Sequence, residues 1–184
     1  MAMDARVRYT KMVIVQSFIK LLKDKPINRI TVKEICELSE INRATFYKHY
    51  LDVYDLLDKI EAQYLDELTG VLNSRKNNAP KDVLTLIMAN FKAKEEIYKA
   101  VFSANGDPSF PAKVLEKCNY IEIDQAQVHT KKNLTQEQRV WVYQFIANGC
   151  NGILNKWISG GMKEPISEVA GFVEMLVNSS LSNL

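Results

Sequence analysis

The chain has 184 residues, of which 47% are hydrophobic and 25% are charged, and both values are those of an ordinary globular protein. Its 24 Lys and Arg residues and 22 Asp and Glu residues leave a formal net charge of only +2. This composition excludes a disordered tail, a collagen-like repeat and an acidic solvating domain.

Signals for membrane insertion and secretion are absent from the sequence. No apolar run approaches the roughly 18 residues that a membrane-spanning helix needs, and the first residues contain no apolar leader segment. The three cysteines, Cys36, Cys118 and Cys150, are odd in number and widely spaced, which indicates reduced thiols and not a disulfide framework. We therefore expect a cytoplasmic protein that does not associate with membranes.

The small net charge is unevenly distributed along the chain. Residues 1–50 contain 10 basic and 5 acidic residues, which leaves 14 basic and 17 acidic residues for the remainder. A basic first quarter is compatible with a nucleic-acid-binding head, although asymmetry of this size also occurs by chance in neutral domains.

Apolar residues recur with a period of about 3.6 residues nearly throughout, and no stretch alternates strictly enough to indicate a sheet, so the predicted fold is all-α. A polar break at 75–80 is the best candidate for a linker, and Gly160-Gly161 marks a helix end. In chain order, helices are predicted at 6–23, twice within 31–50, at 52–74, 81–92 and 95–103, from the turn at 105–108 to about 127, at 135–159 and at 165–180.

Two closely spaced helix starts lie within residues 30–50. Thr31 and Glu34 have the spacing of a capping box, and Ile30 and Ile35 flank it as a hydrophobic staple. Asn42 is a good N-cap for the second helix, and around it Ile41 and Phe46 repeat the staple spacing. The turn between these helices has only about three or four residues, which is the arrangement of a helix-turn-helix.

The second short helix sorts its side chains onto two faces. Phe46 and Tyr50 are four residues apart and are predicted to point into the core. The opposite face carries Arg43, Ala44, Tyr47 and Lys48, which combine a small residue with hydrogen-bond donors for base edges or phosphates. An ordinary three-helix bundle with a merely solvated face is the alternative, and an exposed tyrosine between Arg and Lys weighs against it.

The segment ITVKEICELSEINRATFYKHYLDVYDLL resembles the DNA-binding signature of the TetR family of bacterial one-component regulators, and the match extends over about residues 8–60. The specific parts are I-T-V-[KR]-[DE]-I and T-F-Y-[KR]-H-[FY]. The resemblance implies base-edge contacts at Lys33, Arg43, Ala44 and Lys48. It implies phosphate or mixed contacts at Thr31, Asn42, Thr45, Tyr47 and His49. We accordingly divide the chain into a DNA-binding domain at 1–52, with its helix-turn-helix at 31–50, and a regulatory and dimerisation domain at 53–184.

Two residues depart from the family pattern, and two segments of the second half resemble a particular subgroup of the family. Glu40 stands where the family usually has glycine, so a strained turn is expected, and Val53 replaces a lysine that often contacts phosphate. Residues 105–110 and 149–162 resemble a subgroup that includes regulators of dihydroxyacetone-kinase operons.

The last two long helices are apolar beyond what one core face requires, which suggests burial against a second subunit. The alternative is a fully internal helix in a monomer. The family resemblance implies a four-helix dimer interface, and the residues that we predict for it are Ile153, Trp157, Val169, Phe172, Val173 and Leu176.

Gly149 and Gly152 interrupt the long helix at 135–159, which suggests close helix contact or space for a ligand. A set of aromatic residues is predicted to line an apolar inducer pocket in this region, or else simply to form core: Phe91, Tyr98, Phe102, Phe110, Trp141 and Phe145.

Enzyme activity is not indicated by the sequence. His49 and His129 lie in different segments, so no metal cluster with sensible spacing is expected, and there is no GxSxG, P-loop or GxGxxG motif. Cys150 follows a glycine, but a small buried thiol is far commoner than a nucleophile. We expect no catalytic residues and no cofactor.

Taken together, these features predict a homodimeric transcriptional regulator, most often a repressor in this family, that binds double-stranded DNA at a palindromic operator and is released by a small-molecule inducer. The alternative is a TetR-like co-activator or protein-interaction module that does not bind DNA. The basic and hydroxyl groups of the second short helix favour the first hypothesis.

Overall fold

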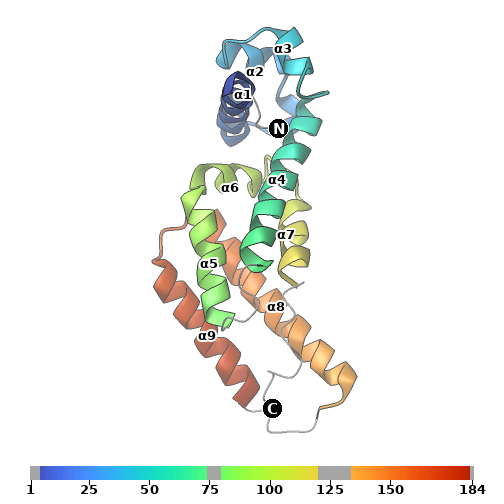
Figure 1. Ribbon diagram of the computed structural model, residues 1–184. Helices are drawn as coiled ribbons and strands as arrows, with labels where there is room; N and C mark the ends of the chain where they lie inside the picture. Colours follow the sequence, from blue (N-terminus) through green and yellow to red (C-terminus); the bar gives the residue numbers. More distant parts are fainter. Residues whose placement is uncertain (1–4, 74–79, 120–133, 183–184) are drawn as a thin grey trace. The chain divides into compact units, whose positions relative to one another are not determined.

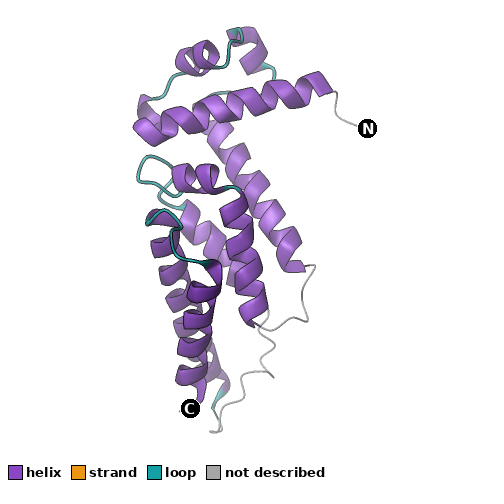
Figure 2. Ribbon diagram, turned by 90° about the vertical axis from the view of Figure 1, so that its left-hand side faces the viewer, coloured by secondary structure: helices purple, strands orange, loops and turns teal. Residues whose placement is uncertain are grey.

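The structure is a computed structural model that describes residues 5–73, 80–119 and 134–182, and within these ranges every regular element is a helix (Figures 1 and 2). The predicted all-α fold is therefore confirmed. The chain divides into two compact units. Unit 1 consists of Met1–Tyr64 and Glu96–Phe110, and unit 2 consists of Leu65–Glu95 and Pro111–Leu184.

Unit 1 is formed around the N-terminal helices (Figure 1). In chain order these are α1 (Ala5–Asp24), a short 3-10 helix (Ile27–Arg29), α2 (Val32–Leu38), α3 (Arg43–Tyr47), the first part of α4 (Val53–Asn73) and, from its second residue, α6 (Glu95–Val101). The unit therefore reaches beyond the predicted 1–52 domain, because α4 continues the head to Tyr64 and a distant segment joins it. The 3-10 helix has no counterpart among the predicted elements.

The core of unit 1 is built from large apolar side chains at helical spacing. Phe18 and Leu22 of α1, Ile35 of α2 and Phe46 of α3 are all fully buried. α1 packs on α2, and α2 packs on α3. Burying each such side chain contributes about 1.5–3 kcal/mol, so this shared core stabilises helices that are too short to persist alone.

Unit 2 contains α5 (Pro80–Ala93), α7 (Phe110–Asn119, from its second residue), α8 (Gln136–Ser159) and α9 (Ile166–Ser182), and α9 packs against both α5 and α8. α8 begins with a capping box between Thr135 and Gln138. It ends at the predicted Gly160-Gly161 stop, beyond which the amide of Met162 donates to the carbonyl of Trp157 at 2.8 Å.

Some predicted features lie wholly or partly outside the described residues. The polar break at 75–80 does so except for Pro80, which begins α5, and so does the predicted continuation of α7 from 120 to 127. Among the helices that the structure describes, none is long and apolar enough to cross a membrane.

Candidate nucleic-acid interface

The first helix of the helix-turn-helix, α2, begins with the predicted capping box. The hydroxyl of Thr31 accepts a hydrogen bond from the amide of Glu34 at 3.3 Å, and the amide of Thr31 donates to the Glu34 carboxylate at 3.0 Å. The other carboxylate oxygen accepts from Lys25 Nζ at 2.5 Å. The hydrogen bonds from Lys25 and then from Thr31 lower the pKa of Glu34 from 4.5 to about 2. Glu34 therefore joins the segment after α1 to the start of α2.

The turn from α2 to α3 contains the strained residue that the sequence predicts. Glu40 has φ 55°, in the left-handed region that favours glycine, and the amide of Ile41 then donates to the carbonyl of Cys36 at 3.1 Å. Asn42 caps α3, because its Oδ1 accepts from the amide of Thr45 at 2.7 Å and from its hydroxyl at 2.9 Å. These bonds fix where α3 starts.

α3 separates its side chains as predicted. Phe46 is fully buried and Tyr50 just beyond the helix is 6% exposed, and their ring centroids are 5.6 Å apart. Tyr47 is 54% exposed. Arg43, Ala44 and Lys48 are also exposed. This outward face of α3, defined by Arg43, Ala44, Tyr47 and Lys48, therefore presents two cations, a phenol and a methyl group to solvent.

The other predicted contact residues also keep access to solvent. Thr31, Lys33 and Asn42 are exposed, and Thr45 and His49 are half-buried. Partial burial lowers the pKa of His49, and the nearby charges of Lys11 and Lys48 lower it further. Lys11 of α1 thus adds a cation beside α3 that the local motif cannot reveal, because the two residues approach only when α1 packs across the head.

The start of α4 supports α3, and at position 53 it has valine where the family often has a phosphate-contacting lysine. Val53 is only 5% exposed, so it belongs to the core. Asp52 caps the start of α4, because its Oδ1 accepts a hydrogen bond from the amide of Asp55 at 2.8 Å. One turn later, Lys59 donates to the carbonyl of His49 at 3.1 Å and to Asp55 at 2.8 Å. These contacts hold the chain that follows α3 against α4.

The six aromatic residues predicted to line a ligand pocket are found in different settings. Tyr98, Phe102 and Phe110 form an aromatic cluster in unit 1, with successive centroids 6.1 and 5.2 Å apart, while Phe91 is buried in unit 2. Trp141 and Phe145 of α8 are 60% and 72% exposed. The prediction is therefore corrected for these two residues, because α8 turns them outward instead of into an enclosed space.

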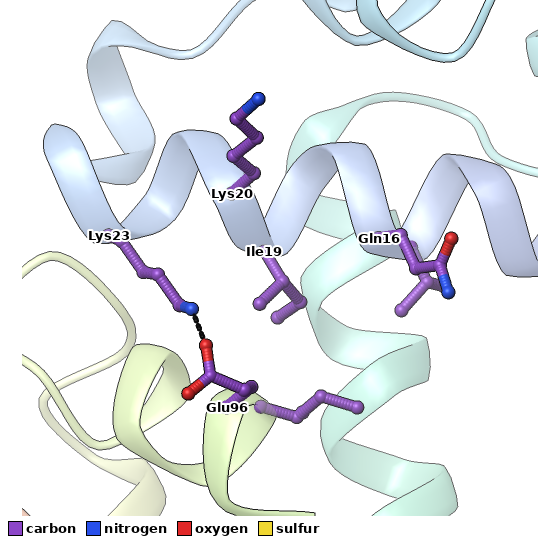
Figure 3. Close-up of a pocket in the computed structure, with 7 residues that line it drawn as sticks. Gln16, Ile19, Lys20, Lys23 and Glu96 are labelled. Atoms are coloured by element: carbon purple, nitrogen blue, oxygen red, sulfur yellow. Dashed lines mark hydrogen bonds and ion pairs between the residues drawn. The ribbon is translucent and has the colours of Figure 1, made fainter. Parts of the chain in front are cut away.

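A pocket that the structure does show lies between α1 and α6 within unit 1 (Figure 3). Figure 3 shows Ile19 on its wall and Lys23 directed toward Glu96, with which it forms an ion pair. The lining contains none of the predicted aromatic residues, and its members are Val15, Gln16, Ile19, Lys20, Lys23, Glu96 and Ile97.

The predicted dimer residues divide into buried and exposed members. Trp157 and Val173 are 4% and 5% exposed, and the Trp157 indole donates to the carbonyl of Glu164 at 3.0 Å, so both belong to the core of unit 2. This corrects their assignment to a partner-facing surface. Ile153 and Val169 are half-buried, and Phe172 and Leu176 are exposed.

The two thiols that the structure describes lack the features of a nucleophile. Cys36 is buried and Cys150 is half-buried. Burial raises the pKa of both thiols. A raised thiol pKa disfavours the reactive thiolate, which favours the packing role over the catalytic one.

An all-α chain whose N-terminal unit carries a capped helix-turn-helix with a basic outward face defines a protein of the helix-turn-helix regulator class. The chain belongs to the TetR family of transcriptional regulators, since residues 78–179 match the family model described as the transcriptional regulator C-terminal region.

Several solved structures of regulators share the fold. The TetR transcriptional regulator from Streptococcus agalactiae 2603V is 20% identical with a TM-score of 0.68, over 95% of this chain and 96% of that one. The fatty acid degradation regulator FadR from Bacillus halodurans is 12% identical with a TM-score of 0.69, over 91% and 94%. The dihydroxyacetone kinase operon activator DhaS is 16% identical with a TM-score of 0.65, over 94% and 96%. No functionally curated protein matches the sequence significantly.

Proposed function

We propose that this TetR-family protein regulates transcription by binding a near-palindromic DNA operator as a homodimer, with one helix-turn-helix on each half-site. The observation that carries the proposal is the outward face of α3. Its residues Arg43, Ala44, Tyr47 and Lys48 are exposed, while Phe46 anchors the opposite side of the helix in the core. A helix held in this way can enter a major groove without losing its own packing.

The roles of the exposed residues follow from their chemistry. Arg43, Lys48 and Lys33 donate hydrogen bonds to base edges, and the small side chain of Ala44 allows close approach. Tyr47 and His49 contact phosphates together with Thr31, Asn42 and Thr45. Lys11 joins this second group, because its charge already acts on His49 in the free protein. Each good bidentate base contact discriminates by about 1–3 kcal/mol.

A second copy of the chain is the partner that best fits the exposed apolar residues of α8 and α9. On α8, Trp141 and Phe145 are followed on the same face by Gly149 and Gly152, and an added Cβ at either glycine would meet nothing within 4 Å. In an antiparallel two-fold pairing, the bulky end of one α8 meets the glycine end of the other. Phe172, Met175 and Leu176 of α9, all at least 40% exposed, extend the surface.

The regulatory part of the proposal is repression that a small-molecule inducer relieves, which is common in this family. One of the structurally similar proteins is named as an operon activator, so a separate assay must distinguish repression from activation. A reporter gene placed behind the selected operator gives it directly: we expect expression to rise when the regulator is deleted. A fall on deletion would instead assign activation.

The test of DNA binding starts with the purified full chain and a random pool of duplexes. We expect enrichment of a sequence with two related half-sites, and steep loss of binding as salt rises. Lys48→Ala is expected to weaken operator binding about tenfold or more without unfolding the protein. Lys163→Ala removes an exposed lysine from the connection between α8 and α9, away from the proposed dimer face of α8, and is the matched control. Unchanged affinity of Lys48→Ala for both operator and random DNA would contradict the placement of this side chain.

A milder substitution tests the same outward face of α3. Tyr47→Phe removes one hydroxyl and is expected to weaken binding several-fold, less than Lys48→Ala, because a single phosphate hydrogen bond is lost.

Passage of the wild-type protein straight through a DNA column at low salt would favour the alternative of a co-activator that acts by protein contacts alone.

A further inference from the structure

One residue of the turn between α6 and α7 is bonded to the end of α1. The side-chain amide of Asn105 donates to the carbonyls of Leu22 and Lys23, at 3.0 and 3.4 Å, and the amide of Ile27 donates to the backbone carbonyl of Asn105 at 2.9 Å. The last carbonyls of a helix have no partner within the helix. Asn105 therefore caps α1 from 82 residues further along the chain.

A second contact holds the same end of α1 from the start of α6. Lys23 forms an ion pair with Glu96, and Ile19 lies beside this pair (Figure 3). Ile97 also lines this pocket. Both ends of the segment 96–105 are thus attached to the last turns of α1. The segment is therefore held against the end of this helix by an ion pair at one end and by hydrogen bonds at the other.

The turn that carries Asn105 has little freedom to change shape. A Cβ at Gly106 would lie 2.5 Å from the carbonyl oxygen of Val101, so the turn is too tight for any other residue at that position. The amide of Asn105 donates to the hydroxyl of Ser103 at 3.2 Å, and the amide of Ser109 donates to Asp107 at 2.8 Å. Asn105 is therefore presented to α1 by a rigid support.

From the end of α1 the contacts continue to the helix-turn-helix. Lys25, two residues beyond Lys23, donates to Glu34, and Glu34 in turn holds Thr31 at the start of α2. Ile27, bonded to Asn105, begins the 3-10 helix whose end precedes Thr31. Asn105 thus fixes the short connection that leads from α1 into α2.

We propose that Asn105 is a positioning residue for operator binding, which sets the helix-turn-helix relative to the α6–α7 turn without touching DNA. This inference rests on the proposed function. The segment 96–110 is joined at both ends to residues of unit 2, so it is a covalent route by which changes in that unit reach the head. Two heads bind a palindrome tightly only when both are in register, so loosening this contact reduces full-operator affinity and spares the contacts of a single head.

The experiment compares two substitutions that add the same charge at adjacent residues. Asn105→Asp keeps the size of the side chain but replaces the donor amide with a carboxylate that faces two carbonyls. Ala104→Asp adds the charge at an exposed neighbour and leaves the bonds to α1 in place. Each full-length variant is titrated against a duplex with both half-sites and against one with a single half-site scrambled.

Asn105→Asp is expected to bind the full operator about tenfold more weakly, while its affinity for the single half-site changes less than twofold. Ala104→Asp is expected to change both affinities less than twofold. Equal losses on the two duplexes would assign Asn105 a merely structural role, and no loss on either would also overturn the proposal. If circular dichroism shows that Asn105→Asp is unfolded, Asn105→Ser is measured against the same criteria.

A measurement without DNA separates this proposal from the proposed function. Amide hydrogen exchange of the free protein is expected to be faster in Asn105→Asp at Ile27 and at Thr31, and unchanged in Ala104→Asp. If the wild-type protein binds no duplex, the DNA-binding function fails by itself. Faster exchange at both amides then still supports positioning of the helix-turn-helix by Asn105, and unchanged exchange overturns it.

Discussion

The short helix α3 and the long helix α8 both bury apolar side chains but turn opposite chemistry outward. α3 sets Arg43, Tyr47 and Lys48 toward solvent, whereas α8 exposes Trp141 and Phe145. Cations and hydroxyls remain well solvated until a polyanion replaces water, while exposed aromatic rings gain free energy only by leaving water. The difference fits the two partners proposed for this chain, a nucleic acid for α3 and a second copy of the chain for α8.

The largest expected effect comes from removing the buried side of α3. Phe46→Ala deletes a fully buried ring and is expected to lower the free energy of unfolding by about 3–5 kcal/mol. Denaturant unfolding of the variant measures this loss. Tyr47→Ala, at the exposed neighbouring position, is the control and is expected to change stability by less than about 0.5 kcal/mol. Similar losses at both positions would show that α3 has no distinct inner and outer faces.

The next effect tests the outer face of α8. Phe145→Glu places a charge on a side chain that is 72% exposed, so the fold of one chain is expected to persist. A dimer built on this face would lose about 2 kcal/mol or more for each copy, which shifts the protein to monomer at micromolar concentration. Sedimentation measures the shift. Leu51→Glu, at a 77% exposed position of unit 1, is the matched control that leaves the dimer intact. A dimeric Phe145→Glu variant would place the interface elsewhere.

A smaller effect concerns the turn that orients α3. Glu40→Gly relieves the left-handed backbone of Glu40 and is expected to stabilise the protein by up to about 1 kcal/mol, after the entropy cost of glycine is subtracted. Thermal unfolding provides the measurement. Glu40→Ala removes the same carboxylate but retains a Cβ, so it is expected to give no gain. Destabilisation by Glu40→Gly would mean that the Glu40 side chain contributes more than its backbone strain costs.

The smallest effect is a pH dependence at the start of α2. The pKa of Glu34 is lowered to about 2 in the folded protein, so its contribution to stability is present above the ordinary glutamate pKa of 4.5 and is lost as pH falls toward 2. The unfolding midpoint of wild type is therefore expected to exceed that of Glu34→Gln above pH 5 and to converge with it by about pH 2. Glu37→Gln, on the exposed side of α2, is the control. A constant difference across this range would contradict the assigned role of Glu34.

The helix-turn-helix could be predicted closely because its signals are local. Thr31 with Glu34 and Asn42 with Thr45 satisfy backbone groups within a few residues, so sequence spacing alone determines where α2 and α3 begin. The unusual backbone of Glu40 was predicted because the family usually has glycine there.

What could not be predicted depends on residues that are distant in the sequence. The bonds from Asn105 to α1 and the approach of Lys11 to His49 arise only when separate helices pack together. Periodicity marks Trp157, Val173 and Phe172 alike as apolar, but it cannot tell which of them α8 and α9 bury against their own chain. For the same reason, periodicity cannot distinguish an exposed position from a pocket-lining one at Trp141 and Phe145.

The capping of α2 and α3 limits which side chains of the helix-turn-helix are available for base contacts in the proposed complex with DNA. Oxygens of Thr31 and Asn42 are already bonded to Glu34 and Thr45, so the side chains left to probe base edges are mainly those of Lys33, Arg43 and Lys48. Lysine and arginine donate hydrogen bonds but cannot accept them, which lets them meet the O6 and N7 atoms of guanine but not the amino groups of adenine or cytosine. If the proposed DNA binding holds, we expect each half-site to favour guanine, because guanine alone offers two major-groove acceptors to one donor side chain.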